Sequence, residues 1–421
     1  MKHITLAMLI SLSTHFAFAQ DTTPQKDTTQ QIVQGRTNSK EQQTKPYVIM
    51  ISIDGFRYDY AEKYQATNLL RLSAEGVKAT AMQPSYPSLT FPNHYTLITG
   101  LYPAHHGLVD NSFYDRNRKQ TYEMKNRDAV EDGTWYGGTP LWVLAEKQHM
   151  VSASYFWVGS ESPIQNTRPT YSYRYQEKTG IDNRIQSVVN WLKLPEAQRP
   201  HLITFYFPEV DHAGHSYGPE SAQVKEQVKF VDESIGKMVK AVSKLKLPVN
   251  YIIVSDHGMA AVDTVHLIQL KDMGLKMSWG GEKMMFYSDD TAKVNAAYAY
   301  YKSHEDHFRT YRKGEMPARW HYGAEDKFNR IGDIILVPDA YYVFAQPKKK
   351  EQHIGHHGFD NNLTDMNAVF MAWGPAFKQH QRIGTFANIH VYPLVAKILG
   401  LKIEEPVDGK LDVLAPILKR Q

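Results

Sequence analysis

Four short runs of nearly continuous apolar residues mark the chain, at residues 47–53, 201–207, 249–255 and 368–373. Runs of this length without alternating polar positions are typical of strands that are covered on both faces. Between them, apolar residues recur every three or four positions, which predicts helices. The helical stretches are residues 60–75, 140–147, 181–192, 219–245 and 389–399. Strands alternating with helices predict an α/β fold with a mainly parallel central sheet and helices on both faces.

The N-terminal 45 residues have a different pattern from the rest of the chain. A basic start and a short apolar stretch end in Ala17-Phe18-Ala19, so we expect a signal peptide over residues 1–19 and export to the periplasm or the medium. Residues 20–45 are rich in Gln, Thr, Lys and Asp and have no apolar periodicity, which predicts a flexible polar linker. We expect one catalytic domain over residues 46–421, with an insertion at residues 285–350, where the pattern is least regular.

Composition excludes several classes of protein. A net charge of +4 on 421 residues gives no case for a stable complex with nucleic acid. No apolar run is long enough to span a bilayer. The chain has no cysteine, so it can form neither disulfides nor a lipoprotein anchor at the expected cleavage site. Any metal site must therefore use histidines and carboxylates.

Acidic residues follow three of the four predicted strands. Asp54 comes directly after the first strand, Asp211 lies shortly after the second, and Asp256 comes after the third. In open α/β sheets, ligands bind beyond the carboxyl ends of the strands. We therefore expect these three carboxylates to lie close together.

Histidines accompany these carboxylates at spacings that suit metal binding. In "EVDHAGHSYGP", Asp211 and His215 are four residues apart and share one face of a helical turn. "SDHGM" adds His257, and "GHHGFDN" supplies His356 and His357 in a glycine-flanked loop. Carboxylate and imidazole without thiolate suit Zn²⁺, with Mn²⁺ or Fe as alternatives. About six such ligands exceed one tetrahedral ion, so we expect two. His94, His105 and His106 are expected to be ordinary polar loop or helix residues.

Thr90 stands between a Pro/Ser-rich loop and a helical stretch in "PSLTFPNHYTLITG". A threonine at this position can cap the helix, and it can also be a nucleophile at the positive end of the helix. A free hydroxyl is a poor nucleophile at neutral pH, but a bound divalent metal would activate it.

Five motifs together resemble the nucleotide pyrophosphatase/phosphodiesterases of the alkaline phosphatase superfamily. They are "SIDGFR", "PSYPSLTFPNHYTLITGLYPAHHGLVDN", "EVDHAGHSYGP", "VSDHGM" and "GHHGFDNN", and the likeness covers roughly residues 46–401. The resemblance implies an alkaline-phosphatase-like fold and two Zn²⁺ per chain. One ion would be held by Asp211, His215 and His357, and the other by Asp54, Asp256, His257 and the nucleophile Thr90. His357 is preferred over His356 because the family's histidine directly precedes glycine, although a local exchange of the two remains open.

The resemblance also implies a reaction. Thr90 would attack phosphorus to form a phospho-threonine ester, which water then hydrolyses, so that nucleotide diester and pyrophosphate bonds release nucleoside monophosphates. Asn111 matches the family's phosphate-binding asparagine. Phe91 and Tyr206 are placed to form a flat slot for a base, and Tyr175 matches the family's base-stacking tyrosine.

Three other functions remain open at this stage. Phosphomonoesterases of the superfamily carry a Lys-x-Arg pair in a segment that corresponds to residues 154–163, where this chain has neither lysine nor arginine. A choline-lipid phosphodiesterase would use the same site, and a secreted binding protein would keep the fold without the chemistry. The expected partners are small nucleotide or other phosphodiester substrates, and the sequence does not fix the oligomeric state.

Overall fold

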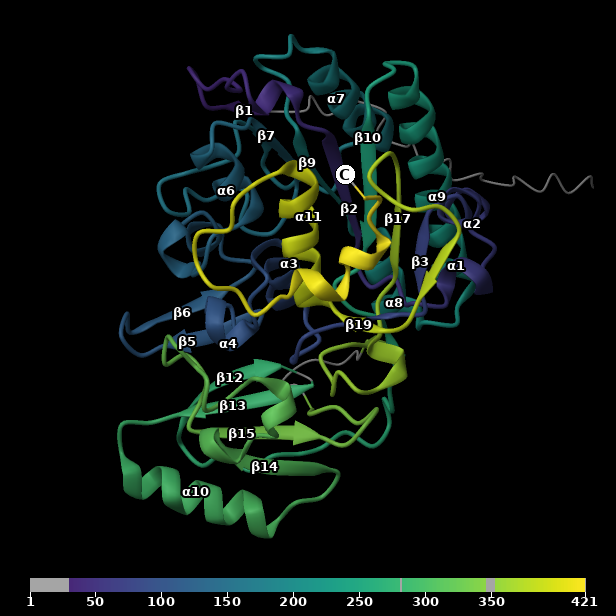
Figure 1. The fold of residues 1–421 in the computed structure, drawn as a ribbon. Coiled ribbons are helices and arrows are strands. Elements are labelled where there is room, and N and C mark those ends of the chain that lie inside the picture. The colour runs from purple at the N-terminus through teal and green to yellow at the C-terminus, as the bar shows by residue number, and fades with distance from the viewer. Residues whose placement is uncertain (1–29, 281, 346–352, 421) are drawn as a thin grey trace, which may run out of the picture.

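The computed structural model describes residues 30–280, 282–345 and 353–420. Its centre is a nine-stranded sheet with the order β1-β8-β7-β9-β2-β10-β17-β3-β18 (Figure 1). Five of the eight neighbouring strand pairs are parallel. The strands are β1 (Gln30–Ile32), β2 (Tyr47–Ile53), β3 (Val77–Ala79), β7 (Ser152–Tyr155), β8 (Tyr171–Tyr173), β9 (Leu202–Phe207), β10 (Val249–Val254), β17 (Phe370–Trp373) and β18 (Gln381–Ile383). The predicted α/β fold with a mainly parallel sheet is confirmed.

Helices cover both faces of this sheet. Side chains of β2 alternate between two hydrophobic cores, with Val48 and Met50 in one and Ile49 and Ile51 in the other. The first core also contains residues of α3, α6 and α11, and the second contains residues of α7, α8 and α9 (Figure 1). The main helices are α1 (Tyr60–Lys63), α2 (Thr67–Ala74), α3 (Thr90–Thr99), α6 (Leu141–Lys147), α7 (Ile181–Lys193), α8 (Glu209–Tyr217), α9 (Ala222–Ser243) and α11 (Val391–Leu399). Within the described ranges, no helix has the length and apolar character needed to cross a membrane.

A second, four-stranded antiparallel sheet lies beside the first (Figure 1). One face of this sheet packs in a core of its own, to which α10 (Thr291–Ser303) contributes, and the other face, with Met285 and Ile335, belongs to the first core of the central sheet. Its strands, in the order β12-β13-β15-β14, are β12 (Lys276–Gly280), β13 (Lys283–Tyr287), β14 (Phe308–Arg312) and β15 (Ile334–Pro338). We call residues 276–338 the small subdomain. It begins before the expected boundary at residue 285, because none of the apolar residues of β12 is buried and the strand carries little apolar pattern.

The polar segment before the main domain differs from the expectation. Strand β1 pairs antiparallel with β8 at the edge of the sheet. Asn38 is buried, donates to the carbonyls of Glu196 and Arg199, and accepts from the amide of Val151 at 2.7 Å. The flexible-linker prediction is therefore wrong for residues 30–45, which are held by hydrogen bonds and not by an apolar stripe. The expected signal peptide and the rest of the linker lie outside the described residues.

The remaining elements are short connections around these two sheets. They are α4 (Pro103–His106), α5 (Arg127–Val130), β4 (Met82–Gln83), β5 (Ser112–Asp115), β6 (Gln120–Glu123), β11 (Ala260–Ala261), β16 (Gly355–His356) and β19 (Phe386–Ala387). The hairpin of β5 and β6 leads from α4 toward the small subdomain, where β5 lies next to β12.

Candidate metal centre and active site

Three adjacent parallel strands deliver the acidic residues to one edge of the sheet. β9, β2 and β10 are neighbours, and Asp54 and Asp256 lie just beyond the ends of β2 and β10. Asp211 is in the first turn of α8, which follows β9. Gly55 has a φ of +66°, and a Cβ there would lie 3.0 Å from the Cα of Asp211. Glycine at this position therefore lets the loop after β2 approach α8, which brings Asp54 and Asp211 together.

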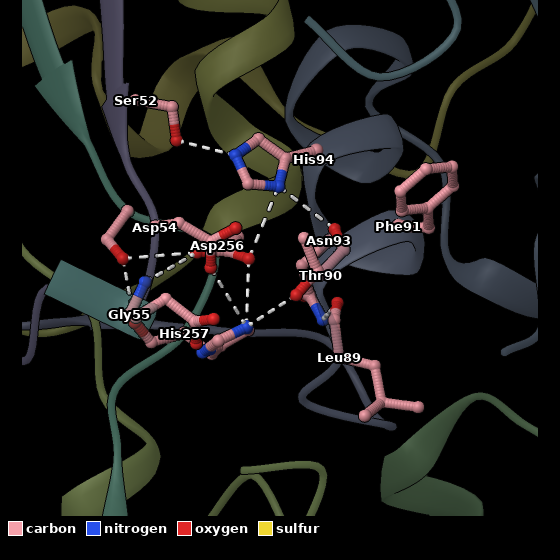
Figure 2. A network of polar contacts seen from close by, with 12 residues as sticks. Ser52, Asp54, Gly55, Leu89, Thr90, Phe91, Asn93, His94, Asp256 and His257 are labelled. Carbon is pink, nitrogen blue, oxygen red and sulfur yellow. Dashed lines mark hydrogen bonds and ion pairs between the residues drawn. The ribbon is translucent and has the colours of Figure 1, made fainter. Parts of the chain in front are cut away.

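Thr90 is the first residue of α3, and Leu89 occupies the N-cap position. The Leu89 side chain cannot accept a hydrogen bond, and the Thr90 hydroxyl lies 3.1 Å from Nε2 of His257 (Figure 2). Thr90 is thus not the cap residue, and its hydroxyl points to the carboxyl ends of the strands. The helix N-terminus adds a partial positive charge at the same point.

The side chains form two neighbouring clusters of possible metal ligands. Within each cluster, one ligand atom per residue lies within 4.8 Å of the others. The imidazole rings of His257 and His357 stack at 3.5 Å between centroids, so the clusters adjoin. The first cluster consists of Asp54, Asp256 and His257, and the second of Asp211, His215 and His357.

The histidine rings are oriented as metal ligands would be. In each ring, Nδ1 donates to a backbone carbonyl at 2.8 or 2.9 Å, which leaves Nε2 directed into the cluster. The acceptors are Gly355 for His215, Gly258 for His257 and Ser88 for His357. Such a hydrogen bond fixes the tautomer and the ring orientation of a ligating histidine.

The spacing of the ligand atoms fits a tetrahedral ion. Ligands at about 2.0–2.2 Å from Zn²⁺ lie roughly 3.3–3.6 Å from one another. In the second cluster, His215 Nε2 and His357 Nε2 are 3.1 Å apart and lie 3.5 and 3.6 Å from Asp211 Oδ1. In the first, His257 Nε2 lies 2.9 Å from Asp256 Oδ2 and 3.5 Å from Asp54 Oδ1.

Electrostatics point to the same conclusion. Burial and the nearby carboxylates of Asp256 and Asp211 raise the pKa of Asp54 well above its ordinary value. Burial and the two neighbouring imidazoles lower the pKa of His357, so this ring is neutral and can ligate a metal. One buried oxygen of Asp54 and one of Asp211 have no hydrogen-bond partner among the described residues. Converging buried carboxylates of this kind favour a compensating cation, and the residues therefore fit two divalent metals.

Asn111 lies beside the start of α3. Its Oδ1 accepts a hydrogen bond from the backbone N–H of Phe91 at 2.9 Å. This bond connects the loop before β5 to the residue that follows Thr90. Because the oxygen is engaged, the amide nitrogen is the group that can donate to a phosphate oxygen. Asn111 also lines a cavity of about 330 Å³ together with His215 and His357.

His94 is a member of the site that the sequence did not identify. It is fully buried, and its Nδ1 donates to the carbonyl of Thr90 at 3.0 Å and lies 3.2 Å from Oδ2 of Asp256 (Figure 2). Its Nε2 lies 2.8 Å from the hydroxyl of Ser52. His94 therefore connects the backbone of Thr90 to a candidate ligand. The position i+4 from Thr90 on a helix was the only available indication, and alone it is weak.

The three aromatic residues expected to form a base slot have different surroundings. Tyr206 is buried, and its hydroxyl donates to Oδ2 of Asp54 at 2.6 Å, so it supports a carboxylate. Its ring is 8% exposed, and its expected contact with the base stays a prediction. Tyr175 is 36% exposed and packs on Tyr206 at 6.1 Å between ring centroids. Phe91 is half-buried against Tyr122.

His356 and His357 point in different directions. His357 belongs to the second cluster, whereas His356 Nδ1 pairs with the carboxylate of Glu282 from the small subdomain. His105 pairs with Asp408 and Glu325. His106 is buried beside Thr96 in the core.

Comparisons with known proteins find relatives over most of the chain. Residues 48–360 match the family model described as type I phosphodiesterase/nucleotide pyrophosphatase. An uncharacterized pyrophosphatase/phosphodiesterase of Schizosaccharomyces pombe is 33% identical over 93% of this chain and 84% of its own length. Venom phosphodiesterase of Naja atra is 32% identical over 88% of this chain, which spans only 46% of that protein.

A solved structure of similar fold is murine ectonucleotide pyrophosphatase/phosphodiesterase 5. It superposes with a TM-score of 0.83 at 28% identity, covering 89% of this chain and all of that one. A second structure of the murine protein is an inactive threonine-to-alanine variant in complex with AMP, and it has the same TM-score.

Proposed function

The chain belongs to the type I phosphodiesterase/nucleotide pyrophosphatase family, and on that basis we propose that it is an exported hydrolase of nucleotide phosphodiester and pyrophosphate bonds. The products are nucleoside monophosphates, and the reaction passes through a covalent ester on Thr90. One observation carries this proposal. The Thr90 hydroxyl stands at the N-terminus of α3 and 3.1 Å from a candidate metal ligand, His257.

The proposed cofactor is a pair of Zn²⁺ ions. Asp211, His215 and His357 would hold one, and Asp54, Asp256 and His257, together with Thr90, would hold the other. When bound, such ions lower the pKa of a coordinated hydroxyl or water and stabilise negative charge on phosphate oxygens.

The protein's own groups position the substrate and supply the nucleophile. Thr90 Oγ1 forms the new bond to phosphorus, and the leaving oxygen departs from the opposite side. Water then hydrolyses the ester and regenerates the threonine. The amide nitrogen of Asn111, fixed because its oxygen accepts from Phe91, donates to a non-bridging phosphate oxygen. A neutral donor suits a site that would already carry two dications when loaded with metal.

Diesters fit the site better than monoesters, which carry one more negative charge. Residues 154–163 correspond to the segment that carries a Lys-x-Arg pair in related phosphomonoesterases, and they contain no lysine or arginine. For the nucleoside arm we propose that Phe91 and Tyr175 contact the base. Support comes from the half-exposed ring of Tyr175 and from the AMP complex of the murine relative.

Substitution of the nucleophile tests this proposal. Thr90→Ala should abolish hydrolysis of nucleoside triphosphates and of bis-p-nitrophenyl phosphate while metal content stays near normal, because six other ligands remain. Thr90→Ser should keep part of the activity. A Thr90→Ala variant with more than about a tenth of the wild-type rate would refute the covalent mechanism. A substrate panel that includes choline lipids and monoesters tests the substrate class, and activity on lipids alone would refute the nucleotide assignment.

A further inference from the structure

The small subdomain contacts the polypeptide on both sides of Asn111. Lys283, the first residue of β13, is 2% exposed, and its Nζ lies 2.9 Å from Oδ2 of Asp110. The same ammonium donates to the hydroxyl of Tyr322 at 2.8 Å and to the carbonyl of Val109 at 3.3 Å. A lysine is seldom buried this completely unless it is paired.

Two further hydrogen bonds join the small subdomain to the residues around Asn111. The Tyr322 hydroxyl donates to the carbonyl of Val109 at 2.8 Å, and the Ser278 hydroxyl donates to the carbonyl of Ser112 at 2.5 Å. The remaining oxygen of Asp110 accepts from the N–H of Ser112 at 3.2 Å. The residues immediately before and after Asn111 are thus held by Ser278, Lys283 and Tyr322, all from the small subdomain.

Asn111 in turn accepts the N–H of Phe91 at the start of α3. The contacts therefore run without a gap from the small subdomain to the residue that follows Thr90. We propose that Lys283 is a positioning residue that acts through Asp110 to hold Asn111 in its phosphate-binding orientation. This inference rests on the proposed function, and it assigns the small subdomain a part in phosphate binding.

A buried ion pair elsewhere in the same interface provides a matched control. Arg330, also from the small subdomain, pairs with Asp115 at 2.8 Å, and both side chains are nearly fully buried. Arg330 also donates to the carbonyls of Gly107 and Trp135 and makes no contact with Asn111. Breaking either pair leaves a buried carboxylate without its partner, so both changes should lower the melting temperature similarly.

The test measures kcat and KM on bis-p-nitrophenyl phosphate for Lys283→Met and Arg330→Met, each in the wild-type and the Asn111→Ala background. Asn111→Ala alone should cost about 100-fold in kcat/KM, as the loss of a transition-state donor does. Lys283→Met should cost about tenfold in the wild type and almost nothing in the Asn111→Ala background, because it acts through that residue. Arg330→Met should change kcat/KM by less than about twofold in both backgrounds.

An equal loss of kcat/KM for Lys283→Met in the two backgrounds would overturn the inference. A loss of kcat/KM no larger than that of Arg330→Met would also overturn it. If Lys283→Met does not fold, Tyr322→Phe removes two hydrogen bonds of the same network, those to Lys283 and to the carbonyl of Val109. It should lower kcat/KM about threefold, and this loss should vanish with Asn111→Ala. Persistence of the loss, or its absence in the wild-type background, would again overturn the inference. A wild-type protein inactive on this diester would instead refute the proposed function and the inference with it.

Discussion

Replacing Tyr206 with phenylalanine separates two possible roles of this residue, support of a metal ligand and stacking on a base. The change keeps the ring and removes only the hydroxyl that donates to Asp54 at 2.6 Å. Asp54 is almost completely buried, so no water can replace the lost donor at little cost. A hydrogen bond to a charged group contributes about 1.5–3 kcal/mol. That energy corresponds to about 10- to 100-fold in metal affinity, the usual range for groups that support metal ligands.

The assay is a titration of metal-free protein with Zn²⁺ against a chelator of known affinity. Tyr206→Phe should weaken one of the two binding events about 10- to 100-fold and leave the other nearly unchanged. Tyr392→Phe is a matched control, because Tyr392 is also buried and its hydroxyl donates to the carbonyl of Thr139, away from the clusters. Zn²⁺ affinity of Tyr206→Phe within about twofold of the control would refute the argument that this hydroxyl holds Asp54 for the metal.

Two further predictions concern the neighbouring histidines and the base. His357→Ala should remove about one metal ion per chain, whereas His356→Ala should keep both ions and lose only its pairing with Glu282. Metal analysis of the purified variants measures this difference. A larger metal loss in His356→Ala than in His357→Ala would contradict the assignment. Tyr175→Ala should lower kcat/KM for nucleoside triphosphates by roughly 5- to 150-fold, equivalent to ~1–3 kcal/mol of stacking, and barely change that for bis-p-nitrophenyl phosphate. Equal losses on both substrates would mean that Tyr175 supports the fold and not the base.

The convergence of three carboxylates could be predicted from the sequence because it depends on local pattern alone. Apolar runs marked β2, β9 and β10 as buried parallel strands, and their carboxyl ends necessarily share an edge. The fourth apolar run became β17, which pairs antiparallel with β10, and no acidic cluster follows it.

Contacts between distant segments could not be predicted in this way. The hydroxyl of Tyr206 reaches across to a neighbouring strand, and His94 meets Asp256, which is far away in the sequence. Asn38 helps to anchor a segment without apolar periodicity through three hydrogen bonds of its side-chain amide. In each case a polar side chain contacts residues that only the folded chain brings near it. Residue spacing and composition therefore cannot predict these contacts.

The small sheet is shared between two hydrophobic cores, and this has a consequence for how the molecule loses its activity. Its face toward α10 lies in a core of its own, whereas Met285 and Ile335 on the other face belong to the same core as Val48 and Met50 of β2. Opening of the small sheet would withdraw Lys283 from Asp110 and would also expose part of the core beneath the central sheet. Activity in mild denaturant should therefore be lost together with the cooperative unfolding of the central sheet. Hydrogen exchange of the β13 amides and of the central strands should report the same free energy, and earlier exchange of β13 would contradict this coupling.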